Sequence, residues 1–208
     1  MKLTYSIPCI ILMATVVSFL GFVVENVWLA FTKGYMDNRN MALPFLLGYG
    51  VAIVTLFIML GTPKNSTFFD RLPFLNTSFK RVSFYFMCAF FFVCVAEILL
   101  GTFIEKSCHI VLWNYSRFTL HITKYTSIPT SSGFAFIITF FMDKCFTPIM
   151  DAISQIDYET SKDISIVFLA LMVFDFAVNS FKMFKNKSFN QTWKIDFKHS
   201  DEEEEVTT

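Results

Sequence analysis

Four carboxylate side chains stand in apolar sequence, where a charge is expensive. They are Glu25, Glu97, Glu105 and Asp175. A charge at the centre of a bilayer costs about 2.5–3.5 kcal/mol on insertion scales, so such residues face protein or water and commonly mark paths for cations or protons. Two of them end a Gly-x-x-x-Glu motif, GFVVE at 21–25 and GTFIE at 101–105. The glycine, one helical turn before the acid, leaves room for a neighbouring helix, a substrate group or a water molecule.

The two motifs are followed by similar sequence, which indicates an internal repeat. Each precedes a tryptophan (Trp28, Trp113), then a polar loop (Asn38-Arg39, Asn114-Tyr115) and then another apolar segment. We therefore expect two helix pairs in tandem and in the same orientation, followed by one further helix. Repeats of this kind often place a polar site at their interface.

The composition indicates that these acids lie in a membrane protein. Of the 208 residues, 54% are hydrophobic and only 16% are charged, and the mean hydropathy is +0.53. These values are typical of a multi-pass membrane protein, whose first partner is the lipid bilayer. The net charge is zero and no Lys/Arg-rich block with interleaved aromatics occurs, which argues against nucleic acid as a partner.

Five segments are long and apolar enough to cross a bilayer, which needs about 20 residues of helix. They cover residues 7–31, 43–61, 82–105, 129–149 and 164–184. The sequence thus predicts an all-α bundle of about five transmembrane helices within residues 1–184. The remainder, 185–208, is predicted to be a hydrophilic tail whose acidic run at 201–205 is solvated and disordered. The first segment is too long for a signal peptide and ends in no Ala-x-Ala-like site. A small excess of Lys and Arg favours a cytoplasmic C-terminus.

The sequence lacks the signatures of several enzyme classes. It contains no GxSxG, SxxK or Walker A motif, and its five cysteines are odd in number and lack zinc-site spacing. We expect no catalytic residue, no cofactor and no metal. If ATP drives the protein, a separate subunit must bind the nucleotide.

A structural role for each acid is the competing interpretation. Glu25 can pair with Arg39 or accept a hydrogen bond from a neighbouring backbone. Glu105 lies beside a lysine near a predicted helix end and is expected at the membrane interface. Glu97 and Asp175 have no charge nearby in the sequence and are the stronger candidates for a polar interior. Elsewhere, the pair Asp143-Lys144 is expected to mark the membrane boundary of the fourth span.

Four stretches together resemble a known family. GFVVENVW, DNRNMALPFLLGYG, AEILLGTFIEK and LWNYS, in this order, are similar to the small bacterial membrane proteins classed as putative ABC-transporter type IV permeases, the CmpB-like family. The family pattern matches Gly21, Glu25, Asn38, Arg39, Pro44, Phe45, Tyr49, Gly50, Glu97, Gly101, Glu105, Lys106, Trp113, Tyr115 and Ser116. The chain departs from it at Asn40 and Leu43, which replace glycines, at Leu47-Gly48, which replace Pro-Ile, and at Asn114, which replaces an aspartate. The resemblance implies a permease of the bacterial inner membrane and a separate ATPase subunit.

Two functional hypotheses follow. In the first, the protein is a transporter permease whose substrate or ion site is lined by residues with polar or charged side chains: Glu25, Arg39, Tyr49, Glu97, Glu105, Trp113, Tyr115 and Asp175. Such a site would favour cations or protonatable groups, with Arg39 as the counter-charge at its mouth. In the second, the protein is a membrane scaffold or regulatory subunit, whose acids hold helices together and whose acidic tail contacts a soluble partner. An intramembrane enzyme ranks last, because no nucleophile or metal set is apparent. The substrate is not evident from the sequence.

Overall fold

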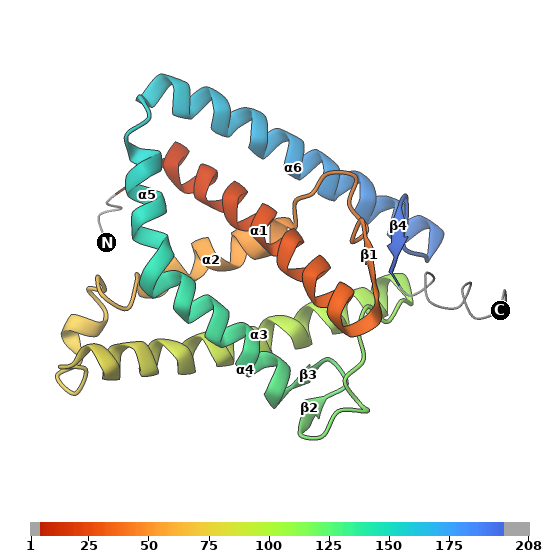
Figure 1. Cartoon of the computed structure of the whole chain (residues 1–208), viewed down its shortest axis with the longest axis horizontal. Helices are drawn as coiled ribbons and strands as arrows, with labels where there is room; N and C mark the ends of the chain where they lie inside the picture. The colour runs from red at the N-terminus through yellow and green to blue at the C-terminus, as the bar shows by residue number, and fades with distance from the viewer. Residues whose placement is uncertain (1–4, 198–208) are drawn as a thin grey trace, which may run out of the picture.

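The computed structural model describes residues 5–197, which form a helical bundle with two small two-stranded sheets (Figure 1). The helices are α1 (Ile7–Lys33), α2 (Leu47–Leu60), α3 (Ser78–Cys108), α4 (Ile128–Phe140), α5 (Phe146–Ser154) and α6 (Tyr158–Asn186), with a short 3-10 turn, η1 (Phe69–Arg71). The strands are β1 (Tyr35–Asp37), β2 (His121–Thr123), β3 (Thr126–Ser127) and β4 (Lys194–Asp196). The predicted all-α membrane bundle is confirmed. The acidic run at 201–205 lies outside the described residues.

Four helical segments are long and apolar enough to span a membrane. They are α1, α3, α6 and the continuous helix Ile128–Ser154, which comprises α4, a π-helical turn η2 (Phe141–Cys145) and α5. Asp143 and Lys144 lie in this π-helical turn, so the charged pair does not end the helix. One extra residue in the turn is accommodated by wider winding, as is common for π-turns within α-helices.

The second apolar segment forms a shorter helix than the sequence suggested. α2 has 14 residues, which give it a length of about 21 Å, against roughly 30 Å for the bilayer core. It begins at Leu47, three residues after Pro44. Gly50 lets α2 lie directly on α1: a Cβ atom at this position would lie 2.4 Å from the carbonyl oxygen of Ala14. α2 is therefore a short helix embedded against α1.

Local signals set the ends of the long helices. Gly34 adopts a left-handed conformation (φ 74°) and its N–H bonds back to the carbonyls of Leu29 and Ala30, which ends α1. The side chains of Thr77, Ser127 and Asp157 cap the first turns of α3, α4 and α6. The loops 34–46 and 109–127 lie at one end of the bundle, with the C-terminal end of α6 (Figure 1).

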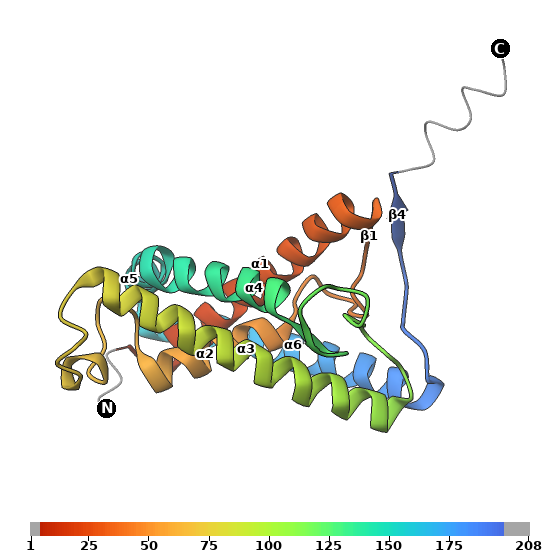
Figure 2. The same cartoon turned by 90° about the horizontal axis from the view of Figure 1, so that it is seen from below.

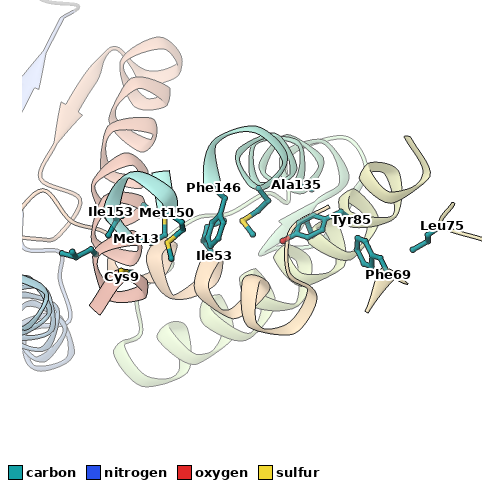
Figure 3. Close-up of a cluster of buried hydrophobic side chains, with 14 residues drawn as sticks. Cys9, Met13, Ile53, Phe69, Leu75, Tyr85, Ala135, Phe146, Met150 and Ile153 are labelled. Atoms are coloured by element: carbon teal, nitrogen blue, oxygen red, sulfur yellow. The ribbon is translucent and has the colours of Figure 1, made fainter. Parts of the chain in front are cut away.

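The packing follows two helix pairs, with α1 against α2 and α3 against α4, and α6 lies along α1 (Figures 1 and 2). The buried core lies toward the opposite end from these loops. Figure 3 shows its 14 buried residues and labels ten of them: Cys9, Met13, Ile53, Phe69, Leu75, Tyr85, Ala135, Phe146, Met150 and Ile153. Long rows of exposed Phe, Leu, Val and Ile on α3 and α6 face outward, as expected of helices in contact with lipid.

Candidate functional site

The first Gly-x-x-x-Glu motif builds a contact between α1 and α2. Gly21 lies against the ring of Tyr49, and a Cβ atom on this glycine would lie 2.5 Å from the Tyr49 Cγ. One turn along α1, Glu25 accepts a hydrogen bond from the Tyr49 hydroxyl through Oε1. Its other oxygen, Oε2, lies 3.2 Å from Nη2 of Arg39 in the loop after β1. The glycine therefore makes room for the tyrosine that binds the acid, and an arginine balances the charge.

The second motif builds the same arrangement from different segments. Gly101 lies against the ring of Tyr125, with 2.5 Å between a Cβ atom on the glycine and Cδ1 of the ring. The Tyr125 hydroxyl donates to Oε2 of Glu105, and Nζ of Lys124 lies 2.7 Å from Oε1. The hydrogen bond to Glu105 raises the pKa of the exposed Lys124 ammonium. Both motifs thus combine a glycine, a tyrosine, a glutamate and a cation, as expected of an internal repeat.

The two arrangements differ in how the tyrosine is held. Tyr49 belongs to the first turn of α2, whereas Tyr125 precedes β3 in the loop before α4. Nε1 of Trp113 donates a 2.7 Å hydrogen bond to the carbonyl of Tyr125 and so fixes this loop. Trp113 therefore holds in place the loop that carries the tyrosine of the second motif.

Glu97 lies deepest of the acids on α3. At about 1.5 Å per residue it is about 16 Å from the end of the helix at Cys108. Its Oε2 accepts a 2.9 Å hydrogen bond from Ser131 of α4, and the Ser131 hydroxyl lies 2.7 Å from that of the buried Thr126. Among residues 5–197, no Lys, Arg or His nitrogen lies within 4.0 Å of this carboxylate. Within the described part of the chain, Glu97 is therefore held by hydroxyl groups without a counter-charge.

Tyr115 lies in the loop between α3 and α4. Burial of the phenol is the main factor that raises its pKa, to about 12, and the carboxylates of Glu97 and, more weakly, Glu25 add to the effect; a hydrogen bond with Thr130 opposes it. The charges of two carboxylates from different helix pairs therefore act on the same phenol. The rings of Tyr49 and Phe134, 6.4 Å apart between centroids, join α2 to α4 in the same interface.

We call the set Glu25, Arg39, Tyr49, Glu97 and Tyr115 the inter-pair cluster. Direct contacts join Glu25, Arg39 and Tyr49, and the charges of Glu25 and Glu97 act on the Tyr115 phenol. The cluster contains five of the eight residues that the sequence singled out. Glu105 and Trp113 lie in the second motif, closer to the end of the bundle.

Asp175 has a separate position on α6. Its buried carboxylate accepts hydrogen bonds from the backbone N–H groups of Ala42 (3.0 Å) and Leu43 (3.1 Å) and from the Asn179 side chain (2.7 Å). The two backbone N–H groups hold the loop before α2 against α6. The geometry of Asp175 therefore corresponds to the structural alternative considered above.

Sequence reasoning missed the partners that complete the second motif. Lys124 and Tyr125 adjoin each other in the loop before α4, and a search for a tyrosine some 20 residues after each repeated glutamate would have indicated both tyrosines. Reasoning from sequence also missed Asn40, where the family pattern has a glycine. Its backbone is left-handed (φ 66°), a conformation that asparagine tolerates better than other side chains. Asparagine is therefore compatible with the left-handed backbone at a position where the family pattern has glycine.

No group of three or more His, Cys, Asp or Glu side chains within residues 5–197 is arranged to hold a metal ion. The chemistry available in the inter-pair cluster is therefore that of carboxylates, phenols and one guanidinium group. These groups can bind a cation, exchange a proton or pair with each other.

The comparison with family models agrees with this architecture. A family described as "Putative ABC-transporter type IV" matches residues 12–180, which include both helix pairs and most of α6. No curated protein and no solved structure shows significant similarity to the chain. The family match covers far more than half of the chain and includes both Gly-x-x-x-Glu motifs. The protein, a multi-pass membrane protein by its apolar helices, therefore belongs to this ABC-transporter-related family.

Proposed function

We propose that the protein is the membrane-embedded part of a transporter and that the inter-pair cluster binds a cationic or protonatable solute. The observation that carries the proposal is the unpaired state of Glu97 among the described residues. Glu25 and Glu105 each have a cation within 3.2 Å, whereas the partners of Glu97 in residues 5–197 are hydroxyl groups. An uncompensated carboxylate within a membrane helix is costly unless it is protonated or binds a cation while the protein functions.

The charges around the cluster support a cationic ligand. Arg39 offsets Glu25, so that Glu97 contributes the remaining negative charge at the interface of the helix pairs. Tyr115, whose pKa is about 12, keeps its proton at physiological pH and can donate a hydrogen bond to a carboxylate or a solute. Sites between tandem helix pairs are common in transporters, because relative motion of the pairs can open the site to either side.

Energy from ATP would require a partner. The sequence lacks a Walker A motif, and we propose that a separate ATPase subunit in the bacterial inner membrane supplies it. Purification from the native membrane in mild detergent, followed by mass spectrometry, tests this part. A stoichiometric ATPase supports it, and purification without one points to a secondary carrier or a scaffold.

Cation binding is tested by thermal unfolding of the purified protein with Na⁺, K⁺ or tetramethylammonium at constant ionic strength. We expect at least one of these cations to raise the Tm of the wild type and to have a much smaller effect on Glu97→Gln. Glu159→Gln is the matched control, because Glu159 is an exposed acid at the start of α6. Equal cation effects in all three proteins would contradict the assignment of Glu97.

The scaffold hypothesis remains the alternative, favoured by the pairing of Glu25, Glu105 and Asp175 with structural partners. It predicts that Glu97→Gln lowers membrane abundance as much as it lowers function. It also predicts that deletion of residues 201–208 releases a co-purifying soluble partner.

A further inference from the structure

The chain after α6 folds back onto the loop after α1. β4 pairs antiparallel with β1, with Ile195 opposite Met36, and the N–H of Phe197 donates a 2.8 Å hydrogen bond to the carbonyl of Gly34. Figure 1 shows the two strands side by side at the end of the bundle that carries loops 34–46 and 109–127. We call residues 190–197 the clasp.

Asparagine side chains fasten the clasp to the two residues that flank Arg39. Asn38 donates to the carbonyl of Asn190 (2.8 Å) and accepts from the N–H of Thr192 (3.2 Å). On the other side, the N–H of Asn190 donates to Oδ1 of Asn40 (2.7 Å). Both loop asparagines are buried. The Asn190 side chain also donates to Asn179 of α6 (2.7 Å), the residue that bonds Asp175.

Arg39 is held in a backbone conformation that it would rarely adopt by itself. Arg39 and Asn40 are consecutive and both left-handed, with φ values of 49° and 66°. This conformation is unfavourable for side chains other than glycine and persists where surrounding contacts impose it. The hydrogen bonds of Asn38 and Asn40 to the clasp are such contacts. They direct the Arg39 guanidinium group toward Glu25, 3.2 Å away, and toward Asp37, 3.9 Å away.

We propose that the clasp regulates the charge of the inter-pair cluster by holding Arg39 on Glu25. With the clasp docked, Arg39 pairs with Glu25, and Glu97 has no cation within 4.0 Å among residues 5–197. When the clasp detaches, loop 34–46 relaxes, Arg39 leaves, and Glu25 becomes a second uncompensated carboxylate in the inter-pair cluster. The C-terminal segment, at the surface of the bundle, thereby controls a group about 12 Å inside the end of α1. The regulatory meaning of this coupling rests on the function proposed above.

The coupling is tested by chemical modification of Glu25 in the full-length protein in membranes. A hydrophobic carbodiimide modifies carboxyl groups in apolar surroundings, and mass spectrometry measures the modified fraction of the peptides that contain Glu25 and Glu97. The Arg39→Ala variant gives the reference value: the modified fraction of Glu25 when its ion-pair partner is absent. A truncation after Phe189 removes the clasp, and its matched control, a truncation after Phe197, keeps the clasp and removes only residues 198–208.

We expect the truncation after Phe189 to raise Glu25 modification at least about threefold, toward the Arg39→Ala value, and the control truncation to leave it unchanged. Glu97 modification should change in neither. Thr192→Pro, which removes one N–H that bonds Asn38 but retains the whole chain, should act in the same direction. Thermal unfolding identifies any variant that has lost its fold, and only folded variants are compared.

The proposal is overturned if Glu25 modification in a folded clasp variant stays at the wild-type level while Arg39→Ala raises it. The substitutions Met36→Cys and Ile195→Cys, added to Thr192→Pro, allow a disulfide to hold β4 on β1. When this disulfide is oxidised, Glu25 modification should return to the wild-type level, and when it is reduced, Glu25 modification should rise again. Failure of the disulfide to protect Glu25 would also contradict the proposal. Because this readout needs no transport, it is independent of the cation test on Glu97, and each proposal can fail without the other.

Discussion

Replacement of Gly21 by alanine tests the construction of the first motif most directly. The added Cβ atom would lie 2.5 Å from Cγ and 2.8 Å from Cβ of Tyr49. Favourable carbon contacts lie at about 3.5–4.0 Å, so the ring must retreat by about 1 Å or more. Because the Tyr49 hydroxyl bonds Glu25 one turn away, this movement also breaks the hydrogen bond.

The expected cost is set by three contributions. Overpacking costs about 1–3 kcal/mol, and loss of a hydrogen bond to a charged group about 1.5–3 kcal/mol in addition. Replacing a helical glycine by alanine returns about 1 kcal/mol. Since a shifted ring relieves part of the overpacking, we expect a net loss of about 2 kcal/mol. For a chain of this size this corresponds to a fall in Tm of about 4–8 °C.

Gly133→Ala is the matched control within the same protein. Gly133 also lies in a transmembrane helix, but apart from its chain neighbours and the adjacent backbone of its own helix no atom lies within 4 Å of the position of its added Cβ. It should raise the Tm by up to about 4 °C through helix propensity alone. The assay is thermal unfolding of the purified variants in one detergent, followed by tryptophan fluorescence. If Gly21→Ala raises the Tm as Gly133→Ala does, the proposed glycine–tyrosine contact is refuted. Gly101→Ala should behave as Gly21→Ala does, because Tyr125 lies equally close.

Three further predictions concern other parts of the molecule. Gly50→Ala should lower the Tm more than Gly21→Ala, because its Cβ meets the backbone oxygen of Ala14 at 2.4 Å, and backbone cannot rotate away; an equal or smaller fall would contradict the close packing of α2 on α1. Asp175→Ala should cost about 1–3 kcal/mol by leaving the N–H groups of Ala42 and Leu43 without acceptors, measured by thermal unfolding, with Asp175→Asn less affected. The pKa of the Asp157 carboxyl is lowered, chiefly by the backbone N–H of Thr160 at the start of α6. The cap therefore contributes stability above the ordinary aspartate pKa and loses it as the pH falls through the lowered value. The Tm difference between wild type and Asp157→Ala should be constant near neutral pH and shrink below about pH 4; a constant difference down to pH 2 would contradict the capping role.

Hydrophobic periodicity and length were sufficient for the membrane class and for most helices. Long runs of apolar residues bounded by proline, glycine and polar loops leave little alternative to transmembrane helices, because backbone polar groups must be satisfied internally in lipid. The length of α2 and the continuation of the helix Ile128–Ser154 past Asp143 were less predictable. Both depend on packing: α2 is supported by α1 through Gly50, and the π-helical turn is tolerated within a longer helix.

The candidate site divides in the same way. The sequence by itself determined which acids lie in membrane helices, that two of them follow a glycine by one turn, and that the pattern repeats, since helical spacing alone places these residues on one face. Tertiary structure decided their partners. Tyr125 reaches Glu105 across 20 residues of chain, and Asn190 reaches Asn40 across 150, and no local periodicity encodes such contacts. Loop geometry and helix packing therefore separated the acid that holds a loop, Asp175, from the acid left without a cation among the described residues, Glu97.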